Sequence, residues 1–120
     1  MTEAETAWAA GLFEGEGSII SREETKGTFR RGHLIVQLGM KDEDVVHRFG
    51  EAVGAGRVHS WEQRGTRMWT WRASGDDAAK ILTALLPHFG ERRKDKAVYA
   101  LAGHAEWKRT QHPTVARMRA

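Results

Sequence analysis

The chain has 120 residues, of which 40% are hydrophobic and 29% charged, values that fit one compact domain with a single core. It has no cysteine and a formal net charge of +3, so a disulfide framework, a thiolate zinc site and a cysteine nucleophile are excluded, while the charge alone identifies no partner. No apolar run approaches the roughly 20 residues of a membrane helix and the N-terminus is too polar for a secretory signal, so we expect a cytoplasmic protein without a membrane partner.

The first third of the chain predicts a helix followed by a β-hairpin. Thr2 and Glu5 have the spacing of a capping box, which favours a helix over about residues 2–15. Residues 18–41 have β-branched or aromatic runs on both sides of the turn Lys26-Gly27-Thr28. That pattern is typical of a β-hairpin.

A second helix and a second hairpin follow. Asp42 is suited to the N-cap position, and apolar residues then recur at helical spacing. These residues are Val45, Val46, Phe49 and Val53. Residues 57–74 have the same pattern as the first hairpin, with their turn at Arg64-Gly65-Thr66, so we predict a second pair of strands.

Two more helices complete the predicted order. Ser74 and Asp77 have the spacing of a second capping box. The helix after them is expected to bury Ala78, Ile81, Leu82, Leu85 and Leu86. A last helix over about residues 91–108 has Val98, Leu101 and Ala105 on one face. We therefore predict one α+β domain over residues 1–108 with the order αββαββα, followed by a basic, flexible tail over residues 109–120.

Alternation along the predicted strands separates an apolar face from a polar one. In the first hairpin, one set is Leu34, Val36 and Leu38, and the other is Arg31, His33, Ile35 and Gln37. In the second hairpin, one set is Trp69 and Trp71, and the other is Thr66, Met68, Thr70 and Arg72. We expect a four-stranded antiparallel sheet with helices packed on its apolar face.

Charge is distributed unevenly between the predicted elements. Residues 18–41 hold five cations and two anions and residues 57–72 hold four and one, whereas residues 42–53 hold one cation and four anions. Thirteen of the 19 cations are arginine, which is suited to phosphate and guanine, although abundant arginine, alanine and glycine also indicate a GC-rich bacterial or phage genome. The polar face is either a solvated surface or, as we favour, a saddle that binds nucleic acid.

An unusual segment of glycines and glutamates ends the first helix. Gly11 and Gly15 are four residues apart, so they share a helix face that a second copy of the chain can approach closely. Glu14 and Glu16 are two residues apart, about 200° around a helix, so they cannot form one acid–base pair. In a symmetric dimer, two copies of Glu16 would meet near the axis, and carboxylates beside DNA phosphates suit a divalent metal ion. The alternative is a glycine-rich helix end, closed by Gly17, with exposed glutamates.

The same segment, AAGLFEGEG at residues 9–17, resembles the nine-residue motif of the LAGLIDADG homing endonucleases. It matches at Ala10, Gly11, Leu12 and Gly17 and has glutamates at both acidic positions. The strand opening at residues 17–20, the glycines at residues 54–56 and the αββαββα order extend the resemblance over about residues 6–108. One copy of the motif resembles the homodimeric members of the family.

This resemblance implies a homodimeric, Mg²⁺-dependent endonuclease that makes a double-strand cut at a long, partly palindromic DNA site, encoded with an intron or intein. Glu16 would hold the metal, where the family prefers aspartate. The polar residue that the family has near the end of the second strand falls on Met40, so Gln37 is the nearest substitute, although it faces the other way unless Gly39 forms a bulge. Arg93 best matches a basic residue that supports catalysis in some members, and Lys94 is the neighbouring candidate.

DNA recognition would belong to the polar face of the sheet. A strand of about ten residues rises roughly 33 Å, near one turn of B-DNA, so each copy would read about 10 bp. Trp61 would either stack on a sugar or belong to the core. The predicted DNA-binding residues are Ser18, Ile20, Arg22, Glu24, Arg31, His33, Ile35, Gln37, Arg57, His59, Trp61, Thr70 and Arg72.

Two alternatives belong to other functional classes. Glu16 and Met40 favour a catalytically inactive DNA-binding protein, or an intron-splicing maturase that binds intron RNA, on the same scaffold. The other alternative is a small α+β interaction domain that dimerises through its first helix. A zinc site is not expected, because the six histidines include no HExxH pattern.

Overall fold

A computed structural model describes the backbone of residues 1–26 and 29–119 and the side chains of residues 1–21 and 33–110. The helices are α1 (Glu3–Glu16), α2 (Glu43–Val53), α3 (Gly75–Leu85) and α4 (Glu91–Arg119), with a short 3-10 helix η1 (Leu86–His88). The strands are β1 (Gly17–Lys26), β2 (Phe29–Met40), β3 (Arg57–Gln63) and β4 (Thr66–Ser74). This order confirms the predicted αββαββα arrangement.

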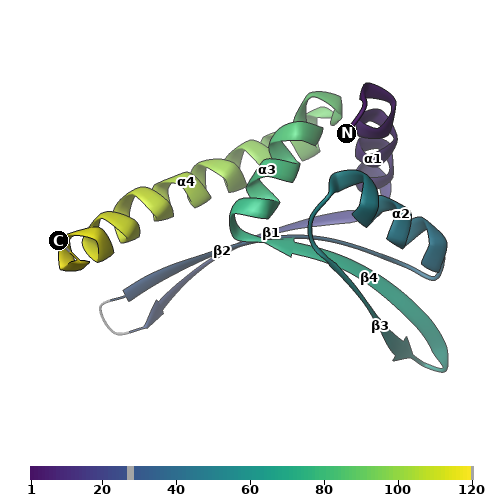
Figure 1. The fold of residues 1–120 in the computed structure, drawn as a ribbon, viewed down its shortest axis with the longest axis horizontal. Helices are drawn as coiled ribbons and strands as arrows, with labels where there is room; N and C mark the ends of the chain where they lie inside the picture. The colour runs from purple at the N-terminus through teal and green to yellow at the C-terminus, as the bar shows by residue number, and fades with distance from the viewer. Residues whose placement is uncertain (27–28, 120) are drawn as a thin grey trace.

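The strands form one antiparallel sheet in the order β1-β2-β4-β3. In Figure 1 the sheet arches, with the two hairpins curving away from the helices, and α1 to α4 all lie on one side of it. The other face of the sheet is therefore not covered by any helix that the structure describes. Within the described residues, no helix is both long and apolar enough to cross a membrane.

The core lies between the sheet and the helices, as the alternation predicts. Leu34, Val36 and Leu38 of β2 are buried, and so is Trp71 of β4. The Phe13 ring of α1 stacks at 6.3 Å on Phe49 of α2 and at 5.7 Å on Phe89. These aromatic contacts join the two αββ units because Phe49 also meets the edge of Trp71, at 4.7 Å between ring centroids.

Two local signals act as predicted. The Thr2 hydroxyl accepts a hydrogen bond from the Glu5 N–H at 3.0 Å, and the Glu5 carboxylate accepts one from the Thr2 N–H at 3.1 Å, which completes the capping box of α1. Arg64 and Gly65 have positive φ angles of 51° and 79°, as a two-residue turn between antiparallel strands requires. Residues 27 and 28, at the first predicted turn, lie outside the described residues.

The second predicted capping box does not form. Ser74 is the N-cap of α3, but its side chain makes no capping hydrogen bond. Ser74 ends β4 in an extended conformation, paired with Ile35, and the chain turns into α3 through Gly75 at φ 61°. The strand pairing thus decides where Ser74 points. Asp42 is the N-cap of α2, also without a side-chain bond.

The prediction for the last helix is wrong in its buried face and in its end. Ala97, Ala100 and His104 are the buried positions in the described side chains of α4, up to residue 110, whereas Val98 is 52% exposed and Ala105 is exposed. Small alanines allow α4 to lie close to β1 and β2, which it contacts. The backbone of α4 continues to Arg119 instead of ending near residue 108. Flexibility of the tail over residues 109–120 stays a prediction.

Candidate nucleic-acid interface and carboxylate site

The face of the sheet opposite the helices carries a row of polar side chains across all four strands. The strand register pairs Ser18 with Gln37, Gln37 with Arg72, and Arg72 with Arg57. Gln37 Oε1 accepts hydrogen bonds from Arg72 Nη2 at 2.8 Å and from Arg72 Nε at 3.2 Å. These bonds orient the Arg72 guanidinium at the centre of the face. Because the Gln37 amide is neutral, it does not compensate the charge of Arg72.

Trp61 lies on this polar face and not in the core. Its side chain is 42% exposed, and its Nε1 donates a hydrogen bond to Thr70 Oγ1 at 3.0 Å. His59 is paired with Thr70 in the strand register and is exposed. The indole is thus held by its polar edge, which leaves part of its ring open to solvent.

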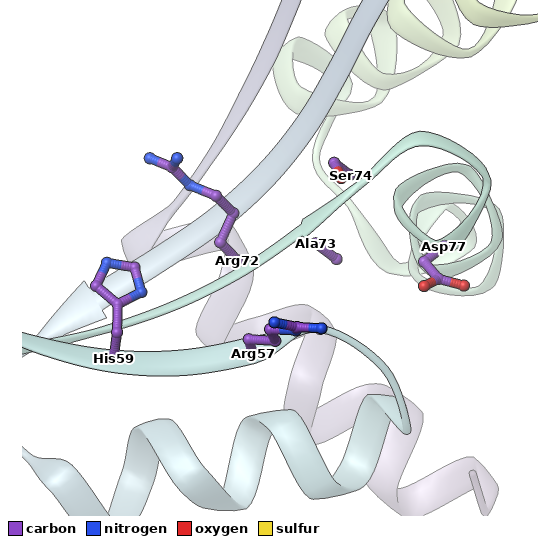
Figure 2. A pocket seen from close by; sticks show the side chains of 7 residues that line it. Arg57, His59, Arg72, Ala73, Ser74 and Asp77 are labelled. Carbon is purple, nitrogen blue, oxygen red and sulfur yellow. The ribbon is translucent and has the colours of Figure 1, made fainter.

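A hollow of about 440 Å³ lies beside this face, at the edge of the sheet where β3 begins, β4 ends and α3 follows. It is lined by Arg57, His59, Arg72, Ser74 and Asp77, with Gly56 and Ala73. Figure 2 shows His59 and Arg72 on the same side of β3 and β4.

Among the described residues, no carboxylate pairs with either arginine of this hollow. Arg57 and Arg72 are opposite each other in the register. Like charges in directly opposite strand positions are unfavourable, and a bound anion would relieve that repulsion. The row and the hollow therefore form a surface suited to a polyanion.

The remaining predicted contact residues are placed as follows. Ile20 and Ile35 are paired with each other, are partly exposed and lie next to the polar row that contains Gln37. His33 is partly exposed and lies further along β2. The backbone pairs Arg22 with His33 and Glu24 with Arg31. The side chains of Arg22, Glu24 and Arg31 lie outside the described residues.

Glu14 and Glu16, the two acidic residues of the motif, have different environments at the end of α1. Glu14 Oε1 accepts a hydrogen bond from the Gly90 N–H at 2.5 Å, and Glu14 Oε2 accepts one from Arg93 Nε at 2.8 Å. The Gly90 N–H, aided by Arg93, lowers the pKa of Glu14 from its ordinary value of 4.5. Glu16 is exposed, and within the described residues it has no hydrogen-bond or ion-pair partner.

Arg93 packs against the end of α1 with 12% of its side chain exposed. Besides its bond to the Glu14 carboxylate, it donates to the Gly17 carbonyl from Nη1 at 2.9 Å and to the Glu14 carbonyl from Nη2 at 3.1 Å. Lys94 is exposed and has no side-chain partner in the described part of the chain. The structure thus brings Arg93 to the motif, with its donors turned toward the protein, and leaves Lys94 in solvent.

Gln37 and Met40 lie on opposite faces of the sheet. The pairing of β2 with β4 is uninterrupted from Gln37 to Met40, so Gly39 forms no bulge. Met40 is partly buried and packs against the core, whereas Gln37 stands in the polar row. Gln37 therefore does not take the place of a polar side chain at position 40.

The glycine face of α1 is open. Gly11 and Gly15 are exposed, and a Cβ at either would meet nothing within 4 Å. No contact among the described residues therefore explains why these positions are glycine.

One chain offers no complete metal site in its described part. No group of three or more His, Cys, Asp or Glu side chains is placed to hold a metal ion. Glu16 contributes one carboxylate, and hard divalent cations take about six oxygen ligands. Further ligands would have to come from a second copy or from a bound molecule.

The role of Glu14 was not found from the sequence. Gly90 and Arg93 are 76 and 79 residues away from it, so no local pattern indicates the contact. The one feature of the sequence that could have indicated different roles is that Glu14 and Glu16 point to different sides of the same helix end.

Comparison of sequences finds no matching family model and no matching curated protein, but comparison of structures finds homing endonucleases. I-CvuI, in complex with its target, superposes with a TM-score of 0.76 at 18% identity, covering 94% of this chain and 73% of I-CvuI. I-TnaI has a TM-score of 0.68 at 13% identity, covering 89% and 76%. The LAGLIDADG meganuclease I-AabMI, bound to uncleaved DNA, has a TM-score of 0.66 at 19% identity, covering 89% and 38%. The chain therefore has the fold of the LAGLIDADG homing endonucleases.

Proposed function

We propose that the chain is a homodimeric, site-specific endonuclease that hydrolyses double-stranded DNA at a long, partly palindromic site. The observation that carries this proposal is the position of Glu16, an exposed carboxylate without a partner among the described residues, where α1 ends and the first strand of the sheet begins. The fold supports it, because I-CvuI and I-AabMI were solved in complex with a DNA target and with uncleaved DNA.

The dimer we propose forms through α1. Gly11 and Gly15 leave open space on the side of α1 away from the core, so the backbones of two α1 helices can approach closely. With a two-fold axis at this contact, the glycine face of α1 in one copy packs against the same face in the other copy. This packing also brings two Glu16 side chains to the centre of a continuous sheet surface.

Glu16 fits the metal-binding role because, in the part of the chain that the structure describes, no residue engages its carboxylate, unlike that of Glu14. A bound Mg²⁺ would lower the pKa of a water nucleophile and stabilise charge on the phosphate and the leaving oxygen. Glu16 from each copy would hold the ion, with DNA phosphates as further ligands. The Lys94 ammonium, exposed one residue beyond Arg93, is the cation we propose to neutralise charge on the cut strand.

Recognition of the DNA belongs to the polar row and its neighbours. Arg72, oriented by Gln37, suits a guanine edge, because a guanidinium can donate two bonds to O6 and N7. Arg57 and His59 suit phosphates. The proposed contact residues are Ser18, Ile20, His33, Ile35, Gln37, Arg57, His59, Trp61, Thr70 and Arg72, together with Arg22, Glu24 and Arg31, whose side chains lie outside the described residues.

A second candidate function is favoured by Met40. Its apolar side chain packs toward the core and cannot order water, so the alternative is a chain that binds without cutting, either a sequence-specific DNA-binding protein or a maturase on intron RNA. In that case, the sheet face binds nucleic acid and Glu16 has no catalytic role.

The test is selection of bound duplexes from a randomised DNA library, followed by incubation of the selected duplex with the protein and Mg²⁺ or Ca²⁺. We expect a double-strand cut with Mg²⁺ that Glu16→Gln abolishes while DNA binding persists. Glu51→Gln, at an exposed carboxylate of α2, is the matched control and should cut normally. Tight, salt-sensitive binding without any cut indicates the binding protein. A monomer without DNA affinity at low salt would contradict both functions.

A further inference from the structure

We propose that Glu14 and Arg93 form a brace that sets the position of Glu16, so that both are positioning residues and neither contacts the DNA or the metal. This inference rests on the proposed function for the role of Glu16. The contacts of the brace themselves lie within one chain.

The brace joins the C-terminal end of α1 to the N-terminal end of α4, and the unpaired backbone groups of these two ends are complementary. The last carbonyls of a helix and its first N–H groups lack partners within the helix, and the dipole favours cations at the C-terminus and anions at the N-terminus. α1 has no basic residue in its last turn, and Arg93 of α4 supplies one by donating to the Glu14 carbonyl. In return, the Glu14 carboxylate accepts the Gly90 N–H directly before α4.

Arg93 holds the chain on both sides of Glu16. Its Nη2 donates to the carbonyl of Glu14 and its Nη1 to the carbonyl of Gly17, so residues 15 and 16 lie between two fixed carbonyls. Gly17 is also held by its own N–H, which donates to the Phe13 carbonyl. The direction in which the Glu16 side chain leaves the backbone is therefore determined by Arg93.

The environment of Arg93 favours this role over direct catalysis. Its Nε and both Nη atoms are already engaged with α1 and Gly17. Its guanidinium lies 5.4 Å from the centroid of the Phe13 ring, and its side chain is 12% exposed. Only the planar fork of arginine can reach these acceptors together, because lysine has a single nitrogen.

The experiment compares Arg93→Lys, which keeps the charge but loses the fork, with Arg92→Lys, the neighbouring exposed arginine. If Arg93 acts through Glu16, Arg93→Lys should lower kcat about 10²-fold, since small displacements at a reacting centre cost that much. It should also raise the Mg²⁺ concentration for half-maximal cutting. DNA affinity measured with Ca²⁺ should stay within about twofold of the parent, as for other substitutions away from the contact surface.

Amide hydrogen exchange in the free protein provides a readout that needs neither DNA nor metal. In Arg93→Lys the Gly17 amide should exchange about tenfold faster than in the parent, because the last turn of α1 loses its charged donors. Glu14→Ala should have the same effect at the Gly90 amide. Thermal unfolding of each variant checks that it is folded.

The outcomes separate this proposal from the proposed function. A parent protein that binds without cutting, with faster Gly17 exchange in Arg93→Lys, overturns the endonuclease but leaves the brace as the support of the α1 end. A parent that cuts, with Arg93→Lys equal to it in rate, Mg²⁺ dependence and Gly17 exchange, overturns the brace. Equal losses of DNA affinity and kcat would also overturn it, since they indicate general damage to the fold.

Discussion

Glu14 and Glu16 illustrate how residues of one type acquire different roles from their surroundings. Only Gly15 separates them in the chain, yet Glu14 is bonded to Gly90 and Arg93 while Glu16 faces solvent. A carboxylate that accepts hydrogen bonds from the protein contributes to the stability of the fold. One without such partners is available for a ligand, which is the basis for proposing Glu16 as the metal ligand.

The lowered pKa of Glu14 leads to a prediction for stability against pH. A carboxylate whose pKa is lower when folded stabilises the protein above its unfolded pKa of about 4.5, and this contribution is lost as the pH falls through the folded pKa. Glu14→Gln should therefore lower the free energy of unfolding at pH 7, by less than about 1 kcal/mol because the group is partly exposed. The difference from the parent should vanish in urea titrations near pH 3.

At the scale of elements, the two faces of β4 have opposite surroundings. Arg72 faces the helix-free side, and its only side-chain hydrogen bonds to described residues are those to the neutral Gln37. Arg67, on the same strand, bonds to Glu62 at 2.8 Å and to Ser60. Strand alternation thus places an uncompensated cation on one face and a paired one on the other.

This contrast predicts the effect of removing each arginine on DNA binding. Arg72→Ala should weaken duplex binding about tenfold, as expected for loss of one direct contact. Arg67→Ala should leave the affinity within about twofold of the parent, because its charge is already paired. Fluorescence anisotropy with the selected duplex over a salt series measures both. Equal weakening by the two substitutions would contradict the assignment of the binding face.

The connection between α2 and β3 also depends on a close contact between elements. Gly56 has a φ of 91°, and a Cβ there would collide with the Trp71 indole and approach the Arg72 carbonyl at 2.8 Å. Trp71 is fully buried, and its Nε1 donates to the Ala55 carbonyl at 2.9 Å. Glycine is therefore required at position 56 by conformation and by packing.

Two alanine substitutions separate these causes. Gly54→Ala, at a φ of 73° with open space around it, should cost about 1 kcal/mol of stability from backbone strain alone. Gly56→Ala adds the collision and should cost about 3 kcal/mol or more. Chemical unfolding of both variants measures the difference, and equal losses would show that Trp71 moves aside freely.

At the scale of the whole molecule, the chain has an arched sheet, one uncovered face and an open glycine stripe on α1. A single copy presents one Glu16 and no described group of three metal-binding side chains. The proposed activity therefore depends on assembly of two copies, since cutting both strands needs two carboxylate centres.

The dimer can be tested by filling the stripe. A Cβ at position 11 would meet nothing within 4 Å, and Gly11→Leu replaces glycine in a helix, so the monomer should be as stable as the parent or up to about 1 kcal/mol more stable. We expect it to sediment as a monomer and to lose double-strand cutting. Ala102→Leu, at another exposed helix position, on α4, is the control and should remain dimeric. A parent that is monomeric at all concentrations would contradict the proposed assembly.

The sequence alone was sufficient for features that depend on neighbouring residues. The order of helices and strands, the Thr2–Glu5 capping box, the turn at Arg64 and Gly65 and the two faces of the sheet all follow from local periodicity and turn chemistry. The resemblance of residues 9–17 to the LAGLIDADG motif also led to the fold that the structural comparison supports.

Tertiary structure decided the features that join distant parts of the chain. Ser74 pairs with Ile35 in the sheet, and the second predicted capping box does not form. Close packing on the sheet places Ala97 and Ala100, and not Val98, on the buried face of α4. The contacts of Glu14 with Gly90 and Arg93, and of Gln37 with Arg72, link residues 35 to 79 positions apart. Local propensity carries no information about such pairs, because they exist only once the sheet and the helices have packed together.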